Sequence, residues 1–338
     1  MNSGPSDAGT VDFSSDQEVR WCPGCGDFAI LAQMKKILPT LGVAPENMVF
    51  VSGIGCASRF PYYLDTYGIH GIHGRAPAIA TGLKRTRPDL QVWVVTGDGD
   101  ALSIGCSHLM HAARRNADIK VLMFNNRIYG LTKGQFSPTS PPGLTTSSTP
   151  FGTVLDPLHP VSVTLACNAS FVARAIDSHT AHLRDVLIRA ARHRGFAFVE
   201  IYQNCHVFND GAFGYARDAD TRHDCIVELT HGEPLVFGKA RDKGIRLNGM
   251  RLEAFSLSDE GAGGPPLVHD ARAGDATLAD MLGRMSHPDM PEAIGVFRAV
   301  ERPTHNDLMD DPDTDLDAPD RVGMLAAILH EGETWTAG

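Results

Sequence analysis

The chain has 338 residues, 43% of them hydrophobic, a formal net charge of −10 at pH 7 and seven cysteines. Its length suits one large α/β domain, or one domain with an appendage, and its composition excludes wholesale disorder. No apolar run approaches the roughly 18 residues of a spanning helix, and the first residues lack the pattern of a secretory signal, so we expect no membrane association. The acidic balance disfavours nucleic acid as a partner. The odd cysteine count disfavours a disulfide framework and favours metal or redox use in a cytoplasmic protein.

Apolar periodicity predicts alternating helices and strands along the first two thirds of the chain. Asp27 is placed to cap the first helix, which should end near Pro39. Later helices are expected at 76–85, 103–116 and 180–194. The expected strands are 47–52, 91–96, 119–124, 170–176 and 196–202. Strands alternating with helices at this spacing are typical of βαβ units around an open, mostly parallel sheet, so the fold class is α/β.

The alternation ends near residue 205. We divide the chain into a flexible N-terminal arm (1–20), an α/β domain (21–208) and a loop-rich C-terminal extension (209–338) with helix candidates at 275–285 and 321–330. Within the domain, residues 130–160 form a long connection rich in Gly, Pro, Ser and Thr, a type of loop that is usually functional or mobile. Residues 301–338 hold ten acidic and two basic residues, which we interpret as a solvated acidic tail.

Two polar turns follow neighbouring strands. Gly97-Asp98-Gly99-Asp100 comes directly after the strand 91–96, and Asn125-Asn126 closes the strand 119–124. Open α/β sheets bind ligands at this carboxyl edge, glycines let the backbone approach a phosphate, and carboxylate and amide oxygens suit Mg²⁺. Either fragment alone is typical of a tight turn or a strand cap. Their joint placement on successive strand ends favours a magnesium and phosphate site.

Four cysteines form the pattern of a metal site. Cys22 and Cys25 make a C-x-x-C with a turn between them, and Cys56 and Cys205 each follow a strand. Four thiolates suit tetrahedral zinc, which the C-x-x-C alone favours, or an iron–sulfur cube. A thioredoxin-like dithiol is disfavoured because the motif precedes the first strand. The other three are expected to be small buried hydrophobes, namely Cys106, Cys167 and Cys225.

Five motifs in order make a family resemblance specific. The GDG-to-NN pair resembles the signature of thiamine diphosphate enzymes, and over about residues 20–206 the chain resembles the β subunit of 2-oxoacid:ferredoxin oxidoreductases, the thiamine- and cluster-carrying half of a two-chain enzyme. The region after about 210 matches only loosely. The motifs are Trp21-Cys-Pro-Gly-Cys-Gly26, Gly53-Ile-Gly-Cys56, His70-Gly-Ile-His-Gly-Arg-Ala76 with Ala80-Thr-Gly-Leu-Lys84, Gly97-Asp-Gly-Asp100 and Asn126-Arg-Ile-Tyr-Gly-Leu-Thr132.

The resemblance implies which residues hold the cofactors. A [4Fe-4S] cluster would be bound by the four cysteines Cys22, Cys25, Cys56 and Cys205. Mg²⁺ would be held by Asp98, Asn126 and the carbonyl of Ile128. The diphosphate of thiamine diphosphate would lie near Ile54, Gly55, Cys56, Ala57, His73, Gly99, Asp100, Gly130 and Leu131.

The resemblance also implies an activity, the reversible, coenzyme A-dependent oxidative decarboxylation of a 2-oxoacid with electrons passed through the cluster to ferredoxin. Arg59 lies in a segment that borders the substrate pocket in the resembling enzymes, and a guanidinium there suits the second carboxylate of 2-oxoglutarate, with pyruvate the next candidate. The stretch 132–135 follows the metal site and is expected to border the pocket. Family members take the glutamate that activates the cofactor from an α subunit, so we expect this chain to be inactive alone and active in an αβ or (αβ)₂ assembly.

Two other interpretations stay open at the level of sequence. The chain could be a non-redox thiamine diphosphate-dependent decarboxylase subunit with a structural zinc at the four cysteines, or a non-catalytic assembly subunit that keeps the fold. Iron and acid-labile sulfide in the protein would favour the redox enzyme over the zinc-containing decarboxylase subunit. Magnesium-dependent binding of thiamine diphosphate would favour a catalytic subunit over the non-catalytic assembly subunit.

Overall fold

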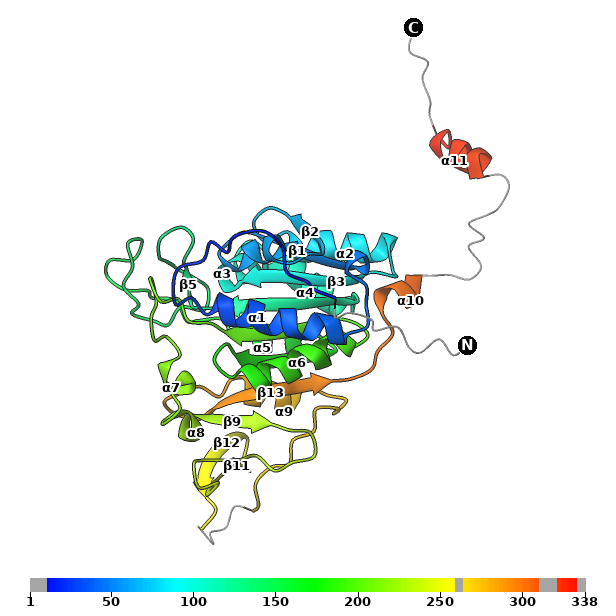
Figure 1. The fold of residues 1–338 in the computed structure, drawn as a ribbon. Coiled ribbons are helices and arrows are strands. Elements are labelled where there is room, and N and C mark those ends of the chain that lie inside the picture. Colours follow the sequence, from blue (N-terminus) through cyan, green and yellow to red (C-terminus); the bar gives the residue numbers. More distant parts are fainter. Residues whose placement is uncertain (1–10, 259–263, 310–320, 333–338) are drawn as a thin grey trace, which may run out of the picture.

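The computed structural model describes residues 11–258, 264–309 and 321–332. Its centre is an 8-stranded sheet in the order β2-β1-β3-β4-β8-β7-β13-β9 (Figure 1). Neighbouring strands run parallel, except that β13 is antiparallel to β7. The strands are β1 (Met48–Ser52), β2 (Tyr67–His70), β3 (Gln91–Gly97), β4 (Ile119–Asn125), β7 (Phe171–Ile176), β8 (Ala197–Tyr202), β9 (Ile226–Leu229) and β13 (Glu292–Ala299).

Helices cover both faces of this sheet, which explains why β1, β4, β7 and β8 are buried along their whole length. One face is covered by α2 (Ala76–Thr86), α4 (Cys106–Arg114), α5 (Pro160–Ala166) and α9 (Thr277–Gly283). The other face is covered by α1 (Asp27–Ile37), the 3-10 helix η3 (Ala57–Tyr63) and α6 (Thr180–Arg192). The open, mostly parallel α/β sheet and the five strands expected from the sequence are confirmed.

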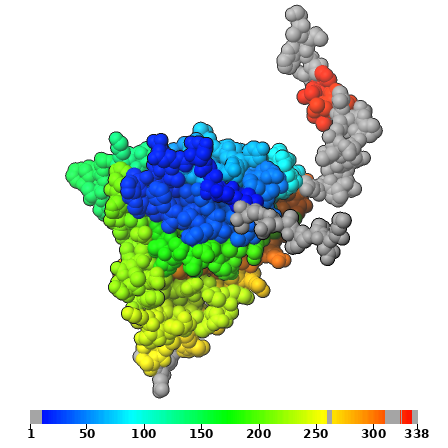
Figure 2. Space-filling model, viewed as in Figure 1, coloured from blue at the N-terminus to red at the C-terminus, as the bar shows by residue number. Residues whose placement is uncertain are grey.

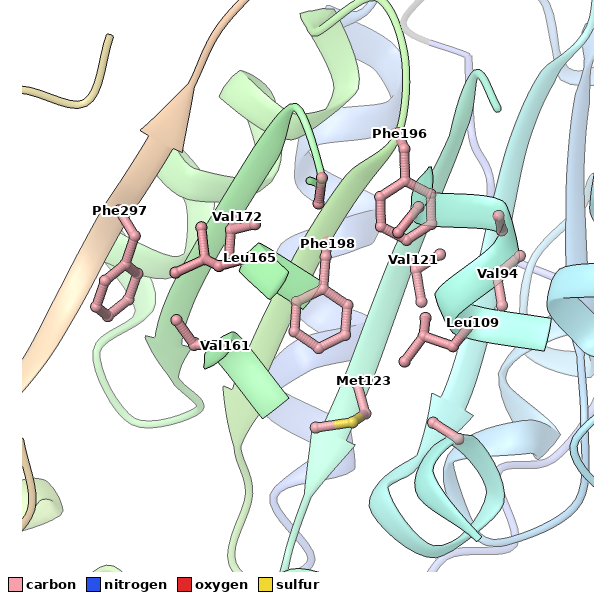
Figure 3. Close-up of a cluster of buried hydrophobic side chains, with 14 of the residues drawn as sticks. Val94, Leu109, Val121, Met123, Val161, Leu165, Val172, Phe196, Phe198 and Phe297 are labelled. Atoms are coloured by element: carbon pink, nitrogen blue, oxygen red, sulfur yellow. The ribbon is translucent and has the colours of Figure 1, made fainter. Parts of the chain in front are cut away.

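Successive residues of the strands pack into different cores. Val94 faces the first layer of helices, whereas Trp93 stacks on Phe50 in the second layer, with ring centroids 5.9 Å apart. Figure 3 shows the first layer, where Leu109 of α4 and Leu165 of α5 meet strand residues. The central strands are therefore held from both sides, and their carboxyl ends are fixed in relation to one another.

The region after β8 contributes more to the sheet than the sequence indicated. Strands β9 and β13 extend the sheet beyond β7, and β10 (Val236–Phe237), β11 (Lys243–Asn248) and β12 (Arg251–Ser256) form a separate antiparallel sheet. Strand β13 was not predicted because charged residues at both of its ends, Glu292 and Arg298, are buried and hide its apolar pattern. The helix candidates are present as α9 and α11 (Arg321–Leu329), and the remaining short helices are α7 (Gly214–Arg217), α8 (Arg222–Cys225) and α10 (His305–Met309).

Other local expectations need correction or lie outside the described residues. Helix α1 begins at Asp27 itself after the N-cap residue Gly26, so Asp27 is a buried residue of the first turn and not a cap. The expected helix 103–116 is present as the shorter α4 (Cys106–Arg114), and the polar turn before it forms an additional helix, α3 (Asp98–Leu102). In the N-terminal arm, Phe13 is buried and its carbonyl accepts a hydrogen bond from the Asp65 N–H, whereas residues 1–10 and the acidic run 310–320 lie outside the described residues.

The domain division remains a prediction. Across the described ranges, no helix is both long enough and apolar enough to cross a membrane. The long connection expected at 130–160 contains β6 (Gln135–Phe136), which pairs with β5 (Ile128–Tyr129) just before it, and it ends where α5 begins. In the space-filling view this blue-green segment protrudes at one end of the molecule (Figure 2).

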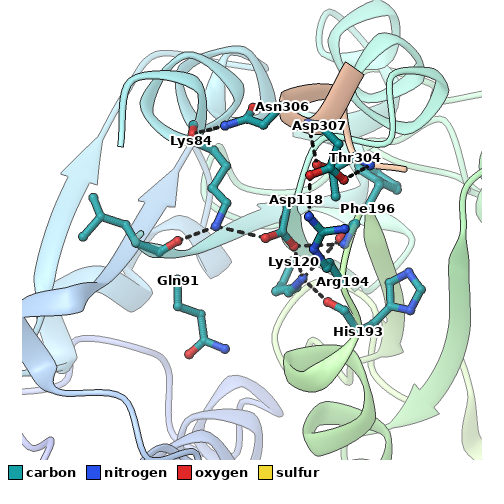
Figure 4. A network of polar contacts seen from close by, with 12 residues as sticks. Lys84, Gln91, Asp118, Lys120, His193, Arg194, Phe196, Thr304, Asn306 and Asp307 are labelled. Atoms are coloured by element: carbon teal, nitrogen blue, oxygen red, sulfur yellow. Dashed lines mark hydrogen bonds and ion pairs between the residues drawn. The ribbon is translucent and has the colours of Figure 1, made fainter. Parts of the chain in front are cut away.

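A buried ionic network closes the opposite, amino edge of the sheet (Figure 4). Asp118, just before β4, accepts hydrogen bonds from Lys84 of α2 at 2.9 Å and from Lys120 at 2.6 Å. Lys84 also donates to the Leu90 carbonyl, and Lys120 donates to the Gly195 carbonyl. Burial by itself would raise the pKa of Asp118, but the two lysines and the N–H of Gly195 outweigh it and lower this pKa to about 2. The network ties α2, β4 and the start of β8 together.

We predict that Asp118→Asn lowers the free energy of unfolding by about 2 to 3 kcal/mol at pH 7, since a pKa lowered by about two units corresponds to this energy. A carboxyl with a lowered folded-state pKa stabilises the protein fully above its unfolded value of 3.8 and loses the effect as the pH falls toward 2. The wild-type advantage, measured by urea unfolding, should therefore be constant from pH 7 to pH 5 and shrink below pH 4. The exposed Asp89→Asn is the control, and an equal effect of both substitutions would contradict the assignment.

Candidate functional site

A cavity of about 470 Å³ opens at the carboxyl edge of the sheet, a size suited to a cofactor. The chain segments that follow β1, β3 and β4 surround it, as expected from the strand ends. All twelve residues that the resemblance assigns to the diphosphate and Mg²⁺ line this one cavity: Ile54, Gly55, Cys56, Ala57, His73, Asp98, Gly99, Asp100, Asn126, Ile128, Gly130 and Leu131. The sequence therefore identified a set of residues that folding brings together.

Asp98 begins α3 at the end of β3 and is buried. Its Oδ2 accepts hydrogen bonds from Ser137 at 2.5 Å and from Thr139 at 2.6 Å. Burial raises the pKa of Asp98 even though these hydroxyls and nearby backbone N–H groups act to lower it. A cation in the cavity would offset the cost of keeping this carboxylate ionised.

Asp100 connects three segments around the cavity. Its Oδ1 accepts hydrogen bonds from the backbone N–H of Ile54 at 3.0 Å and of Gly74 at 2.7 Å, and its Oδ2 accepts one from Thr96 at 2.6 Å. A side chain at Gly53 would overlap this carboxylate, so only glycine permits the approach. The Asp100 carboxylate thus positions the cavity wall and is occupied by donors from the protein itself.

His73 is oriented by the same carboxylate. Its Nδ1 lies 2.7 Å from Asp100 Oδ1, which makes Nδ1 the protonated nitrogen and leaves Nε2 as an acceptor in the neutral ring. The ring is 6.1 Å from that of Tyr129, whose hydroxyl donates to the Gly99 carbonyl at 2.9 Å. A side chain at Gly99 would overlap the Tyr129 ring, so this part of the wall is closely packed.

The amide of Asn126 is held between the backbone and a second amide. Its Oδ1 accepts a hydrogen bond from the Ile128 N–H at 3.2 Å, and its Nδ2 donates to Gln203 Oε1 at 2.8 Å. The Asn126 carbonyl accepts a hydrogen bond from Asn209 at 2.9 Å. Because each contact fixes one end of the side chain, Asn126 keeps a single orientation beside Asp98 and Ile128 in the cavity wall.

A second cavity, of about 210 Å³, lies next to the first and is lined by all four cysteines of the predicted metal pattern. Cys56, Asn126, Gly130 and Leu131 line both cavities, so they form the wall between them. A side chain at Gly130 would contact the sulfurs of Cys205 and Cys56. The four cysteines are Cys22, Cys25, Cys56 and Cys205, and all seven cysteines of the chain are free.

Cys25, Cys56 and Cys205 are half-buried in an acidic environment, whereas Cys22 is exposed. Burial raises the pKa of the Cys56 thiol to about 12, with Asp27 adding to the shift, and it also raises the pKa of Cys25 and Cys205. Burial raises the pKa of Asp27 to about 7, and its Oδ1 has no hydrogen-bond partner in the protein. Thiolates at these positions therefore need a cation or a metal cluster to compensate their charge.

Arg59 is placed differently from the expected cofactor contacts. It lines the cysteine cavity but not the larger one, and its Nη1 donates to the Arg20 carbonyl at 3.3 Å. In the loop that follows β5, Thr132 and Gln135 border the larger cavity, as expected, whereas Lys133 lines the cysteine cavity. The other cysteines, Cys106, Cys167 and Cys225, are half-buried and line neither of these two cavities.

Several residues of the site were missed by the sequence reasoning. Asp27, Tyr129 and Gln203 line the cavities, and Ser137 and Thr139 hold Asp98. Ser137 and Thr139 lie in a loop without periodicity, so no pattern could have placed them against β3. Gln203 had a detectable signal, since it follows the last strand two residues before Cys205.

A buried network of hydrogen bonds and ion pairs connects the site to the C-terminal region. Thr139 lies 3.0 Å from Asn125, whose amide donates to Glu200 at 2.7 Å. Glu200 is paired with Arg174 at 2.8 Å, and Arg174 lies 3.6 Å from Glu292 of β13. The C-terminal region thus contributes an ion to the network that ends at Asp98.

The donor sets fit the groups that the resemblance implies. Asp98, the Asn126 amide oxygen and the Ile128 carbonyl are hard oxygen donors beside one cavity, which suits Mg²⁺ bound to a diphosphate. Four thiols around a separate cavity suit a [4Fe-4S] cluster. Among the described residues, no group of three or more His, Cys, Asp and Glu side chains is arranged to hold one metal ion.

Comparisons with known proteins agree with this arrangement. Residues 53–201 match the family described as "Thiamine pyrophosphate enzyme, C-terminal TPP binding domain". The chain is 51% identical over 328 residues to the 2-oxoglutarate oxidoreductase subunit KorB of Mycobacterium tuberculosis, covering 96% of this chain and 87% of that protein. It is 44% identical to the β subunit of 2-oxoacid:ferredoxin oxidoreductase 1 of Aeropyrum pernix, covering 60% of this chain and 64% of the relative.

A solved structure extends the likeness to the fold. A chain of the 2-oxoglutarate:ferredoxin oxidoreductase from Magnetococcus marinus, whose structure has 2-oxoglutarate, coenzyme A and succinyl-CoA bound, matches with a TM-score of 0.74 and 32% identity over 94% of both chains. Fold and site together define a thiamine diphosphate-binding α/β protein. More specifically, the chain belongs to the β subunits of the 2-oxoacid:ferredoxin oxidoreductases and so is one subunit of an oxidoreductase.

We predict that Asp100→Ala lowers the free energy of unfolding by about 3 kcal/mol or more, because it leaves two buried N–H groups and the Thr96 hydroxyl without their acceptor. Asp100→Asn should cost less, since its oxygen can still accept from both N–H groups. Urea unfolding of the two variants beside Asp89→Ala, an exposed control, tests this ranking. Asp100→Ala as stable as the control would show that the carboxylate does not hold the wall together.

Proposed function

We propose that this chain is the β subunit of a 2-oxoglutarate:ferredoxin oxidoreductase, which catalyses the reversible, coenzyme A-dependent oxidative decarboxylation of 2-oxoglutarate to succinyl-CoA and CO₂. The single observation that carries the proposal is the pair of adjoining cavities, one lined by the Mg²⁺ and diphosphate residues and the other by four cysteines. The names of the Mycobacterium and Magnetococcus relatives support 2-oxoglutarate as the substrate.

In the proposed enzyme Asp98, Asn126 and the Ile128 carbonyl hold Mg²⁺, which neutralises the diphosphate. When bound, thiamine diphosphate supplies the electron sink for loss of CO₂ from a 2-oxoacid. Asp100 holds His73 at the cavity through Nδ1, and a protonated ring there would donate a hydrogen bond from Nε2–H to the diphosphate. The remaining diphosphate contacts come from the segments 54–57, 99–100 and 130–131.

The cysteine cavity is proposed to hold the [4Fe-4S] cluster that passes electrons to ferredoxin. Four cysteines that line one cavity suit zinc or a cluster, and the ferredoxin in the name of the Aeropyrum relative supports the cluster, because ferredoxin exchanges electrons. The wall shared by the two cavities supports this assignment, since one-electron transfer requires a cluster next to the cofactor. Free cysteines and an oxygen-sensitive cluster support a cytoplasmic location.

The substrate's second carboxylate is proposed to pair with Arg59. Among the described residues that line the larger cavity, none is an arginine or lysine, whereas Arg20, Arg59 and Lys133 line the adjoining one. Pyruvate, which lacks this carboxylate, is the second candidate substrate. The distinction rests on the guanidinium alone, so substitution of Arg59 should change the preference between the two acids.

An α subunit is proposed to complete the site and to supply the group that activates the cofactor. The connection from β6 to α5 exposes apolar side chains, including Phe151, Val154 and Leu155. Contiguous exposed apolar residues are typical of a protein interface. The protruding position of this segment supports contact with a second chain (Figure 2).

We predict that Asp98→Ala weakens Mg²⁺-dependent binding of thiamine diphosphate at least about 100-fold. Loss of a residue that binds the metal directly should reduce the affinity at least as much as loss of a residue that only hydrogen-bonds to a metal ligand. The measurement is calorimetric titration of the α–β complex with the cofactor at several Mg²⁺ concentrations. Asp89→Ala serves as the surface control. Unchanged Mg²⁺ dependence in Asp98→Ala would contradict the proposed metal site, and absence of Mg²⁺-dependent binding in the wild type would favour a non-catalytic subunit.

We predict that the complex purified without oxygen contains iron and acid-labile sulfide and reduces a low-potential viologen with 2-oxoglutarate faster than with pyruvate. Arg59→Met should raise KM for 2-oxoglutarate about tenfold, the loss of roughly 1.4 kcal/mol of a charge-assisted hydrogen bond, and leave KM for pyruvate unchanged. A colourless, zinc-loaded protein would refute the redox function. An equal change for both acids would refute the role of Arg59 only.

A further inference from the structure

Gln203 directly follows β8, lines the cysteine cavity and is buried, with 1% of its surface exposed. Its backbone N–H donates to the Asn125 carbonyl at 2.9 Å, which aligns it with the end of β4. Its side chain contacts the proposed Mg²⁺ ligand Asn126 on one side and the proposed cluster ligand Cys25 on the other. In the described part of the chain, no other side-chain amide is hydrogen-bonded to both of these residues.

Backbone groups fix the direction of this amide. Gln203 Nε2 lies 2.6 Å from the Asn204 carbonyl, which can only accept, so the nitrogen and not the oxygen must face it. The second hydrogen on Nε2 is then directed to Cys25 Sγ at 3.3 Å. Gln203 Oε1 accepts from Asn126 Nδ2 at 2.8 Å, which is consistent because the Ile128 N–H holds Asn126 Oδ1 on the opposite side.

Each end of the side chain has a separate physical consequence. An N–H donor to a cluster thiolate stabilises the reduced cluster, which carries one more negative charge, and so raises its reduction potential. An acceptor for Asn126 Nδ2 holds the amide so that Oδ1 faces the proposed Mg²⁺ position. The inference therefore rests on the proposed function and adds a residue that serves both of its cofactors.

We propose that Gln203 is a positioning residue that links the two centres: its Nε2–H raises the reduction potential of the cluster through Cys25, and its Oε1 orients Asn126 for Mg²⁺. It touches neither the substrate nor the reacting atoms. The carboxamide joins the metal end of the cofactor to the cluster through two hydrogen bonds.

Two substitutions separate these roles. In Gln203→Glu, one carboxyl oxygen can still accept the hydrogen bond from Asn126. The carboxyl group carries at most one hydrogen, which the Asn204 carbonyl accepts from this position at 2.6 Å, so no hydrogen is left for Cys25. This variant should shift the midpoint potential of the cluster to more negative values and leave the Mg²⁺ dependence of cofactor binding within about twofold of wild type. Gln203→Met removes both contacts, so it should shift the potential in the same direction and weaken Mg²⁺-dependent binding about tenfold.

The matched control is Gln33→Met. Gln33 is a buried glutamine of α1 whose Oε1 accepts hydrogen bonds from Arg184 at 3.0 and 3.2 Å, remote from both cavity linings. The Gln33→Met substitution removes the same kind of buried amide. We expect it to change neither the midpoint potential of the cluster nor the Mg²⁺ dependence of cofactor binding. All variants are measured as full chains in the α–β complex prepared without oxygen, by redox titration of the cluster spectrum and by titration with MgCl₂ and thiamine diphosphate.

A midpoint potential of Gln203→Glu equal to that of wild type would overturn the role toward Cys25, and this variant decides that point even if Gln203→Met fails to fold. Mg²⁺ dependence of Gln203→Met equal to that of Gln33→Met would overturn the role toward Asn126. Absence of iron and sulfide from the wild-type complex would instead refute the proposed function, before any variant is compared. A normal wild-type cluster with unshifted variants would refute the role of Gln203 alone.

Discussion

The buried carboxylate of Asp100 is the interaction on which the arrangement of the site depends. It fixes the N–H groups of Ile54 and Gly74 and the ring of His73, which lie on the segments after β1 and β2, against the end of β3. The carboxylate is nearly inaccessible to solvent, so its hydrogen bonds replace water that the folded chain excludes. With these segments fixed, the backbone between Ile54 and Ala57 can form a wall common to a cofactor cavity and a cysteine cavity.

The rest of the molecule keeps this edge rigid from two directions. Helices on both faces bury the central strands completely, and the network around Asp118 ties their amino ends together. Glu200 and Arg174 connect Asn125 to Glu292 of the C-terminal region. Such networks stabilise a structure only when each charge is paired, and these pairs connect α2 with β4 and connect β7 with β8 and β13. The C-terminal region is thereby part of the support of the site.

Adjoining cavities for a diphosphate cofactor and for four thiols have a direct chemical advantage. Electrons released at one centre need an acceptor nearby, and here a thin wall that includes Cys56 and Gly130 separates the two. The acidic surroundings contributed by Asp27 disfavour free thiolates, so the cysteine site suits a cluster that brings positive charge of its own. Gln203 is hydrogen-bonded to Asn126, which lines both cavities, and to Cys25, which lines the cysteine cavity.

The sequence by itself determined the parallel α/β sheet and indicated Asp98 and Asn126 at its carboxyl edge, because strand period and strand-end motifs are local signals, whereas the family resemblance supplied the other cavity residues. It also indicated the four cysteines as one group, from a C-x-x-C motif and two cysteines that follow strands. The tertiary structure alone decided that Asp27 is a buried carboxyl beside the sulfurs, that Ser137 and Thr139 hold Asp98, and that Arg59 lies outside the larger cavity. It also decided that β13 joins the sheet, because its buried charges are satisfied by partners more than a hundred residues away, such as Arg174 and Asn168. Contacts of this kind depend on how distant segments pack, and no periodicity in the chain records them.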